Sequence, residues 1–133
     1  MLSSSPLTAG VTLLIVLLMF GTSFAVGKGR HRYGVEAPAV TGHPVFERLY
    51  RVQMNTLEWA AMCLPCLWIC AAYVNDAVAA GLGGVWLVGR VGYAVGYARE
   101  PALRAKGFTV GALAFGALGL AAGGGVLWNL LGY

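Results

Sequence analysis

The chain has 133 residues, of which 59% are hydrophobic and only 11% are charged. Soluble domains carry about 25% charged residues, so this composition argues against an ordinary soluble enzyme domain. The charges are also segregated, since residues 1–27, 59–75 and 107–133 contain none. We therefore predict one membrane domain over residues 1–133, an all-α integral membrane four-helix bundle with short loops.

Four membrane spans are predicted, over about residues 7–26, 46–73, 77–98 and 107–131. The first is longer than the core of a signal peptide, so we expect it to be retained. The second contains Pro65, where we expect a kink because proline removes a helical hydrogen bond. The third and fourth are rich in glycine, which predicts close packing of neighbouring membrane helices.

Basic residues give the chain a net charge of +4 and flank two of the three predicted loops. They are Lys28, Arg30, Arg32, Arg48 and Arg51 around the first loop, and Arg99, Arg104 and Lys106 in the third. The positive-inside rule then places loops one and three in the cytoplasm and both termini on the opposite side. Because these cations lie beside spans, we attribute them to orientation and membrane lipid, and expect no nucleic acid partner.

A polar stripe runs into the second span. Its members follow one another at spacings of three, four and three, and so share one helical face: Arg48, Arg51, Asn55 and Glu58. Ionisable groups at a membrane boundary are costly, and this set can hold a small zwitterionic or anionic ligand. Tyr93 and Tyr97 share a face of the third span, and a hairpin of the two spans would bring Asn55 and Glu58 towards them.

The same charges could instead neutralise one another, because buried ion pairs are often structural. Arg51 could pair with Glu58, and Arg90 could pair with Asp76 or Glu58. Basic groups near the stripe nevertheless outnumber the available carboxylates, and unpaired arginines favour an anionic ligand. The sequence leaves both interpretations open.

Three cysteines share one face of the second span: Cys63, Cys66 and Cys70. Cys63 and Cys66 match the C-x-x-C pattern, but a redox or metal role needs a thiolate in a polar, accessible setting. We therefore expect these cysteines to pack in the apolar span and expect no metal.

Residues 46–58, Phe-Glu-Arg-Leu-Tyr-Arg-Val-Gln-Met-Asn-Thr-Leu-Glu, resemble the E-R-x-x-R-x-x-x-N-x-x-E signature of the membrane-associated proteins in eicosanoid and glutathione metabolism. Residues 92–99, followed by Leu103 and Arg104, are similar to the second signature of that family. Two separated motifs at the right positions make the resemblance specific, and it covers most of the chain.

The resemblance implies a homotrimer of four-helix subunits that acts as a glutathione-dependent membrane transferase or peroxidase. Glutathione, the co-substrate, would lie between neighbouring subunits, held by residues matching the family motifs: Arg30, Arg51, Gln53, Asn55, Glu58, Tyr93 and Tyr97. Arg104 would lie against the sulfur as the catalytic group and favour the thiolate, which is the nucleophile. The bilayer would supply the lipophilic electrophile or hydroperoxide.

Two positions depart from the family pattern. Trp59 stands where its transferases commonly have tyrosine, and His31 follows Arg30 where a member of the family has a second arginine. The change at His31 leaves open whether the first loop takes part in acid catalysis or His31 is only a membrane-interface residue.

Two other function classes compete with the enzyme. One is a non-catalytic membrane protein of the same fold that binds lipid or glutathione. The other is a small multidrug exporter, which would use a carboxylate in its first span, and residues 1–27 contain no acidic group.

Overall fold

The computed structural model describes residues 4–100, 102 and 104–133, and this part of the chain folds into four α-helices. They are α1 (Pro6–Tyr33), α2 (Pro44–Tyr73), α3 (Asp76–Arg99) and α4 (Arg104–Leu130). All four are long and apolar enough to cross a membrane. The predicted all-α architecture of four candidate spans is therefore confirmed.

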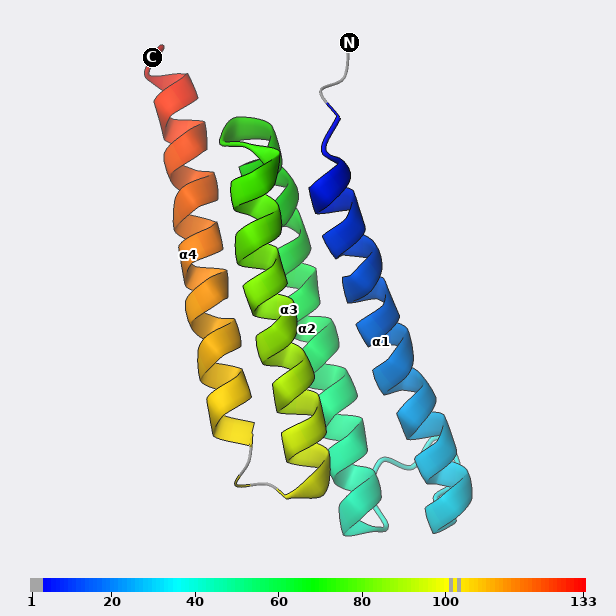
Figure 1. The fold of residues 1–133 in the computed structure, drawn as a ribbon. Helices are drawn as coiled ribbons and strands as arrows, with labels where there is room; N and C mark the ends of the chain where they lie inside the picture. Colours follow the sequence, from blue (N-terminus) through cyan, green and yellow to red (C-terminus); the bar gives the residue numbers. More distant parts are fainter. Residues whose placement is uncertain (1–3, 101, 103) are drawn as a thin grey trace.

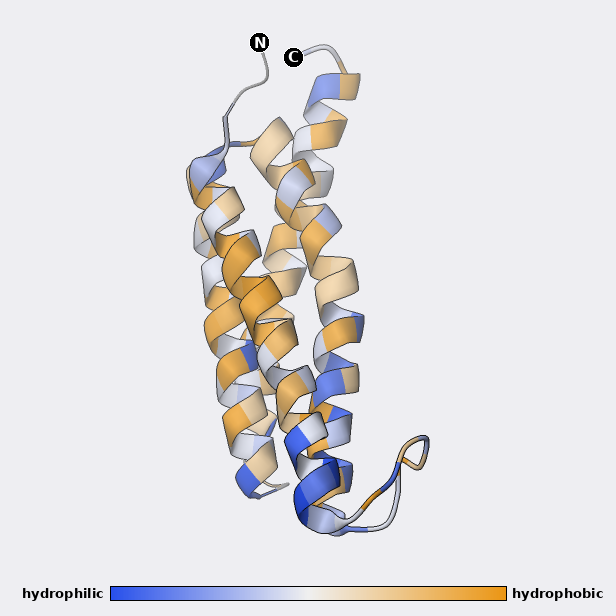
Figure 2. Cartoon of the chain, turned by 90° about the vertical axis from the view of Figure 1, so that its right-hand side faces the viewer, coloured by the Kyte–Doolittle hydropathy of each residue, from blue (hydrophilic) through white to orange (hydrophobic). Residues whose placement is uncertain are grey.

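The helices run side by side along one axis (Figure 1). Both termini and the α2–α3 turn lie at one end, and the α1–α2 and α3–α4 connections lie at the other, which we call the loop end. α1 and α4 lie on opposite sides of the α2–α3 pair. Hydrophobic residues cover the middle of the bundle, while strongly hydrophilic ones gather towards the loop end (Figure 2).

α1 is longer than its predicted span and continues for about two turns beyond residue 26. It ends at Gly34, whose left-handed φ of 67° lets its N–H donate to the carbonyl of Arg30. Lys28, Arg30 and Arg32, which were predicted in the first loop, therefore belong to α1, because a helix can continue past its apolar residues. α2 starts at Pro44, and His43 Nδ1 accepts a hydrogen bond from the N–H of Val45 at 3.2 Å.

The core combines side chains from all four helices. Ile15, Leu67, Trp86 and Leu118 are fully buried in one cluster. Cys63 and Cys70 belong to the same cluster, as expected for packing residues. α2 remains helical through Pro65. Within the described residues, no group of three or more His, Cys, Asp or Glu side chains could hold a metal ion.

The seam between α3 and α4 depends on glycine. A Cβ atom on Gly107 would lie 2.6 Å from the carbonyl oxygen of Gly89 and would overlap the backbone of Tyr93. A Cβ atom on Gly89 would lie 2.6 Å from the backbone nitrogen of Gly111. The two backbones therefore touch, which confirms the packing role predicted for these glycines.

At the end that carries the termini, Asp76 joins α3 to α1. Its carboxylate accepts hydrogen bonds from the backbone N–H groups of Leu7 at 3.0 Å and Thr8 at 2.8 Å. The first N–H groups of a helix have no partner within the helix, so Asp76 acts as a cap supplied from another helix.

Candidate functional site

Two tyrosines and two arginines from α3 and α4 form a tyrosine–arginine column: Arg90, Tyr93, Tyr97 and Arg104. The rings of Tyr93 and Tyr97 stack with centroids 5.6 Å apart and an interplanar angle of 10°. The guanidinium carbon of Arg90 lies 4.2 Å from the Tyr93 centroid, and that of Arg104 lies 5.6 Å from the Tyr97 centroid. Both distances are in the range of cation–π contacts, so each ring is held by a neighbouring cation.

α2 joins this column through a hydrogen bond. The side-chain amide of Asn55 donates to the hydroxyl of Tyr93 at 2.7 Å. The predicted approach of the α2 stripe to the tyrosines of α3 is therefore confirmed for this pair. Tyr93 is almost fully buried, at 2% exposure, so its position is well defined by the surrounding helices.

A cleft of about 310 Å³ opens beside this hydrogen bond, at the first turns of α4. Its lining residues come from three helices: Asn55, Tyr93, Arg104, Ala105, Phe108 and Thr109. The structure therefore brings together three of the predicted site residues, one from each of these helices. Because Gly107 allows α4 to touch α3 here, Arg104 and Tyr93 border the same space.

Arg51 and Glu58 belong to the α2 stripe, and both are exposed on the surface of the single chain. Neither lines the cleft. Buried charges need a partner of opposite charge, but both of these groups are exposed to solvent. A pair between them would therefore contribute little to stability. They remain available to a ligand or a neighbouring subunit.

Arg90 is buried, at 1% exposure. It does not form an ion pair with Asp76, which was one of the alternatives that the sequence left open. The two residues are 14 positions apart on α3, which corresponds to about 21 Å of helix. Asp76 instead accepts hydrogen bonds from the start of α1. Nε and one terminal nitrogen of Arg90 have no hydrogen-bond partner among the described residues.

Gln53 and Arg30 lie on the α1 side of the molecule, apart from the cleft. Gln53 lines a small hollow with Met19 and Thr22 of α1. The guanidinium of Arg30 donates to the carbonyl of Ala39 at 2.6 Å and lies 4.9 Å from the centroid of the Phe46 ring. A single chain therefore does not assemble all the predicted glutathione ligands in one place.

Trp59 supports the wall of the cleft. Its ring meets those of Phe108 and Phe115 edge to face, with centroids 5.6 Å and 5.4 Å apart. The indole is therefore engaged with α4. Phe108 was not predicted as a lining residue, although its spacing of four from Arg104 places both on one face of α4.

His31 is exposed in the last turn of α1. Leu103, which belongs to the second sequence signature, lies outside the described residues.

The amino-acid sequence is similar to those of known membrane proteins. The sequence profile of the MAPEG family matches residues 8–124. An uncharacterized protein of Synechocystis is 44% identical over 93% of this chain and 88% of its own length. Human microsomal glutathione S-transferase 2 is 39% identical over 91% of this chain and 86% of its own length. Guinea-pig leukotriene C4 synthase is 43% identical over 74% and 65%, respectively.

Proposed function

This chain belongs to the MAPEG family, and we propose that it is a glutathione-dependent membrane transferase or peroxidase. The observation that carries the proposal is the cleft that Arg104 lines together with the hydrogen-bonded pair Asn55 and Tyr93. A positively charged group beside hydrogen-bonding groups, next to an apolar membrane surface, suits a reaction between a polar thiol and a lipophilic partner. The similarity to a glutathione S-transferase supports glutathione as the thiol.

The chemistry of glutathione matches the predicted residues. The molecule carries two carboxylates, an ammonium group and a thiol. Arg51 binds a carboxylate, since guanidinium and carboxylate form strong, charge-assisted hydrogen bonds. Glu58 binds the ammonium group, and Asn55, Tyr93 and Tyr97 orient the peptide. Both charged partners are exposed and share a helical face with Asn55, which lines the cleft, so a ligand can reach them.

A homotrimer would complete this site. Gln53 and Arg30 lie on the α1 side of the chain, whereas the cleft lies between α2, α3 and α4. If neighbouring subunits pack with α1 of one against the cleft of the next, Gln53 and Arg30 of one subunit reach glutathione held by the other. The division of the predicted ligands between two sides of one chain supports this assembly.

Arg104 is the proposed catalytic residue. A nearby guanidinium lowers the pKa of a thiol, and the thiolate is the nucleophile. In the transferase reaction, the thiol proton goes to solvent and the sulfur attacks an electrophilic carbon. A carbon–sulfur bond forms and the bond to the leaving group breaks, or an epoxide opens and its oxygen takes a proton.

In the peroxidase reaction, the thiolate attacks the outer oxygen of a lipid hydroperoxide and the O–O bond breaks. The lipid leaves as an alcohol, and a second glutathione displaces water from the oxidised sulfur to give glutathione disulfide. In either reaction, loops one and three face the cytoplasm, where glutathione reaches the loop end of the bundle.

The test uses the purified full chain with glutathione and two probes, an aryl halide and a lipid hydroperoxide. We expect saturable glutathione binding by calorimetry, and conjugation of the halide or reduction of the hydroperoxide. Saturable binding without turnover of either probe would favour the non-catalytic alternative. Absence of glutathione binding would overturn the proposal.

A further inference from the structure

A second hollow region lies on the opposite side of α3 from the cleft. A groove of about 510 Å³ runs between α1 and α3, over α2, and is lined by residues such as Leu14, Leu18, Gly21, Val91 and Ala98. It adjoins a hollow of about 750 Å³ at the loop end, because the two share the lining residues Ala25 and Leu49. The proposed glutathione site uses neither hollow.

The groove is suited to a hydrocarbon chain. Its one hydroxyl, on Thr22, donates back to the carbonyls of Leu18 and Met19 at 3.1 Å and 3.0 Å, so the lining offers no free side-chain donor. From Leu14 to Ala25, the α1 residues that line the groove rise by about 17 Å, which is about half of the ~30 Å hydrocarbon core of a bilayer. The groove therefore has the length of one membrane leaflet.

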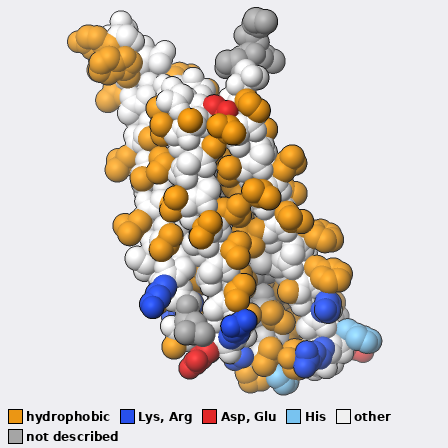
Figure 3. Space-filling model, in the orientation of Figure 1, with side chains coloured by type: hydrophobic (Ala, Val, Ile, Leu, Met, Phe, Trp, Pro, Cys, Tyr) orange, Lys and Arg blue, Asp and Glu red, His pale blue; other side chains and the backbone are white. Residues whose placement is uncertain are grey.

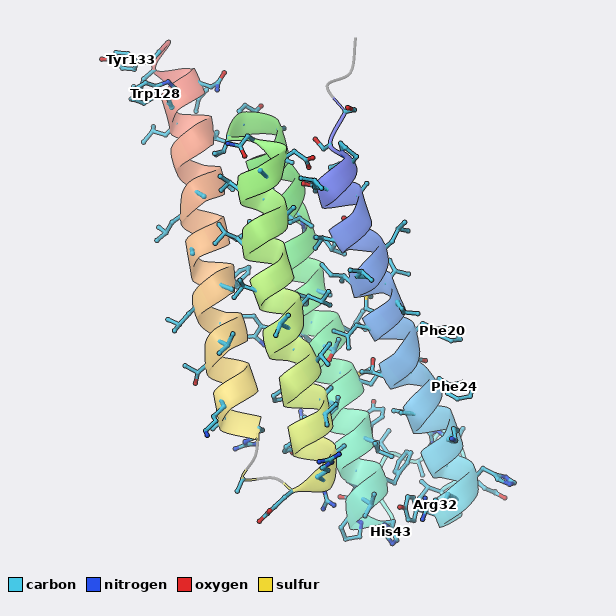
Figure 4. All side chains as sticks on the ribbon, in the orientation of Figure 1. Phe20, Phe24, Arg32, His43, Trp128 and Tyr133 are labelled. Atoms are coloured by element: carbon cyan, nitrogen blue, oxygen red, sulfur yellow. The ribbon has the colours of Figure 1, made fainter. Side chains whose placement is uncertain are left out.

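The loop-end hollow is also largely apolar, but two cations, Lys28 and Arg32, are exposed at its wall. Lys28 Nζ lies 5.9 Å from the Phe24 ring centroid, and the guanidinium carbon of Arg32 lies 5.6 Å from that of Tyr33. Figure 3 shows Lys and Arg side chains gathered at this end of the bundle below a largely hydrophobic surface. Figure 4 shows Arg32 near the loop end of α1 and Phe24 further from that end.

We propose that this groove binds one anionic phospholipid, with an acyl chain between α1 and α3 and the phosphate at Lys28 and Arg32. Leu14, Leu18, Gly21, Ala25, Lys28 and Arg32 follow one another at alternating spacings of four and three, so they form one continuous stripe along α1. Apolar groove and cations thus lie in line, at the depths where acyl chains and headgroups lie.

The charges favour a lipid over a second copy of the chain as the occupant. A second copy would bring its own basic residues of the loop end towards Lys28 and Arg32, whereas an anionic headgroup neutralises these two cations. Arg30, which the proposed subunit contact uses, is two residues from each of these cations and so lies on another side of α1. The lipid and the neighbouring subunit would therefore not compete.

The test measures lipid binding by native mass spectrometry of the purified full chain, titrated with phosphatidylglycerol or phosphatidylcholine. Each surface cation contributes a factor of about five towards an anionic lipid, so the two together should give a preference of about 25-fold for phosphatidylglycerol. Lys28→Gln and Arg32→Gln should each weaken phosphatidylglycerol binding about fivefold. Lys106→Gln, which removes an exposed cation from α4 at the same end, is the matched control and should have no effect.

The groove itself is tested by Gly21→Leu. Beyond the adjoining residues and backbone of α1 itself, no described atom lies within 4 Å of a Cβ atom placed on Gly21, so a larger side chain can fill the groove without a clash at its first atom. We expect loss of lipid binding, while Gly10→Leu, an equally open position on α1 outside the groove, should retain it.

Equal affinity for both lipids, an equal effect of Lys106→Gln, or a change in subunit number with Gly21→Leu would overturn the proposal. None of these readouts involves glutathione, so the result is independent of the proposed enzyme activity.

Discussion

The two sides of α3 are built differently. On the α4 side, Gly89 and Gly107 let the backbones touch, and the chain places Tyr93 and Arg104 around a small polar cleft. On the α1 side, side chains separate the helices, and an apolar groove stays open. Backbone contact thus fixes the relative positions of polar side chains from different helices. Where side chains keep the helices apart, the space remains available to lipid.

The strongest test of this difference is Gly107→Ala. The added methyl group overlaps the backbone of Tyr93, so α3 and α4 must separate. Overpacking of this kind costs about 1–3 kcal/mol, and we expect the upper end because the obstacle is backbone. Thermal unfolding in detergent and glutathione titration should show a lower midpoint and weaker binding.

Gly21→Ala is the matched control on the α1 side, because its new methyl group meets no described atom within 4 Å. Since alanine has the higher helix propensity, we expect unchanged or slightly higher stability. Equal destabilisation by both substitutions would show that the two sides of α3 do not differ in the way described.

Arg104→Ala tests the chemistry of the cleft. Removing a group that stabilises charge in a reacting centre typically lowers the rate by about 100-fold, or about 2.7 kcal/mol. We expect a loss of this size in kcat/KM for conjugation, together with loss of the thiolate absorbance of bound glutathione. Lys106→Ala, two residues further along α4, should keep both. Full activity and thiolate absorbance in Arg104→Ala would remove the assigned role.

Tyr93→Phe tests the link between α2 and α3. It removes the hydroxyl that accepts from Asn55 and leaves the ring stacked on Tyr97. A hydrogen bond contributes about 1 kcal/mol, so we expect about fivefold weaker glutathione binding by calorimetry. Tyr133→Phe, at an exposed tyrosine near the C-terminus, should bind like the wild type.

The smallest effect is expected for Asp76→Ala at the end remote from the cleft. It removes the acceptor for Leu7 and Thr8, so the first turn of α1 loses its cap. We expect a decrease of a few degrees in the thermal midpoint and no change in kcat/KM. Loss of activity without loss of stability would connect this end to the site.

Hydropathy was sufficient to predict the four spans, because each apolar block is long enough to cross a bilayer. Helical spacing also predicted the meeting of Asn55 and Tyr93, since a short α2–α3 turn leaves the two helices antiparallel. The contact of Phe108 with the cleft depends on how α4 lies against α3. That placement follows from Gly107 and Gly89, whose contact pairs residues 18 positions apart and cannot be read from local spacing.

The sequence motifs did not indicate which of the predicted ligands, here Gln53 and Arg30, lie apart from Arg104 in a single chain. A motif orders residues along the chain, whereas the side of the bundle on which each residue lies depends on helix rotation. The helical extension of α1 to Tyr33 was not predicted, for a related reason. Hydropathy indicates which residues lie in the hydrocarbon core of the membrane, but it does not indicate where the helical hydrogen bonds end.

The cap that Asp76 provides has a mechanical consequence. It fixes the first turn of α1 to the start of α3, while the other end of the helix lies about 40 Å away, beside the loop-end hollow. A rod held at one end moves most at the other, so any rocking of α1 displaces Arg30 and Lys28 more than Thr8. A change in the membrane around the groove that tilts α1 would therefore displace Arg30, which is proposed to reach the glutathione of the neighbouring subunit.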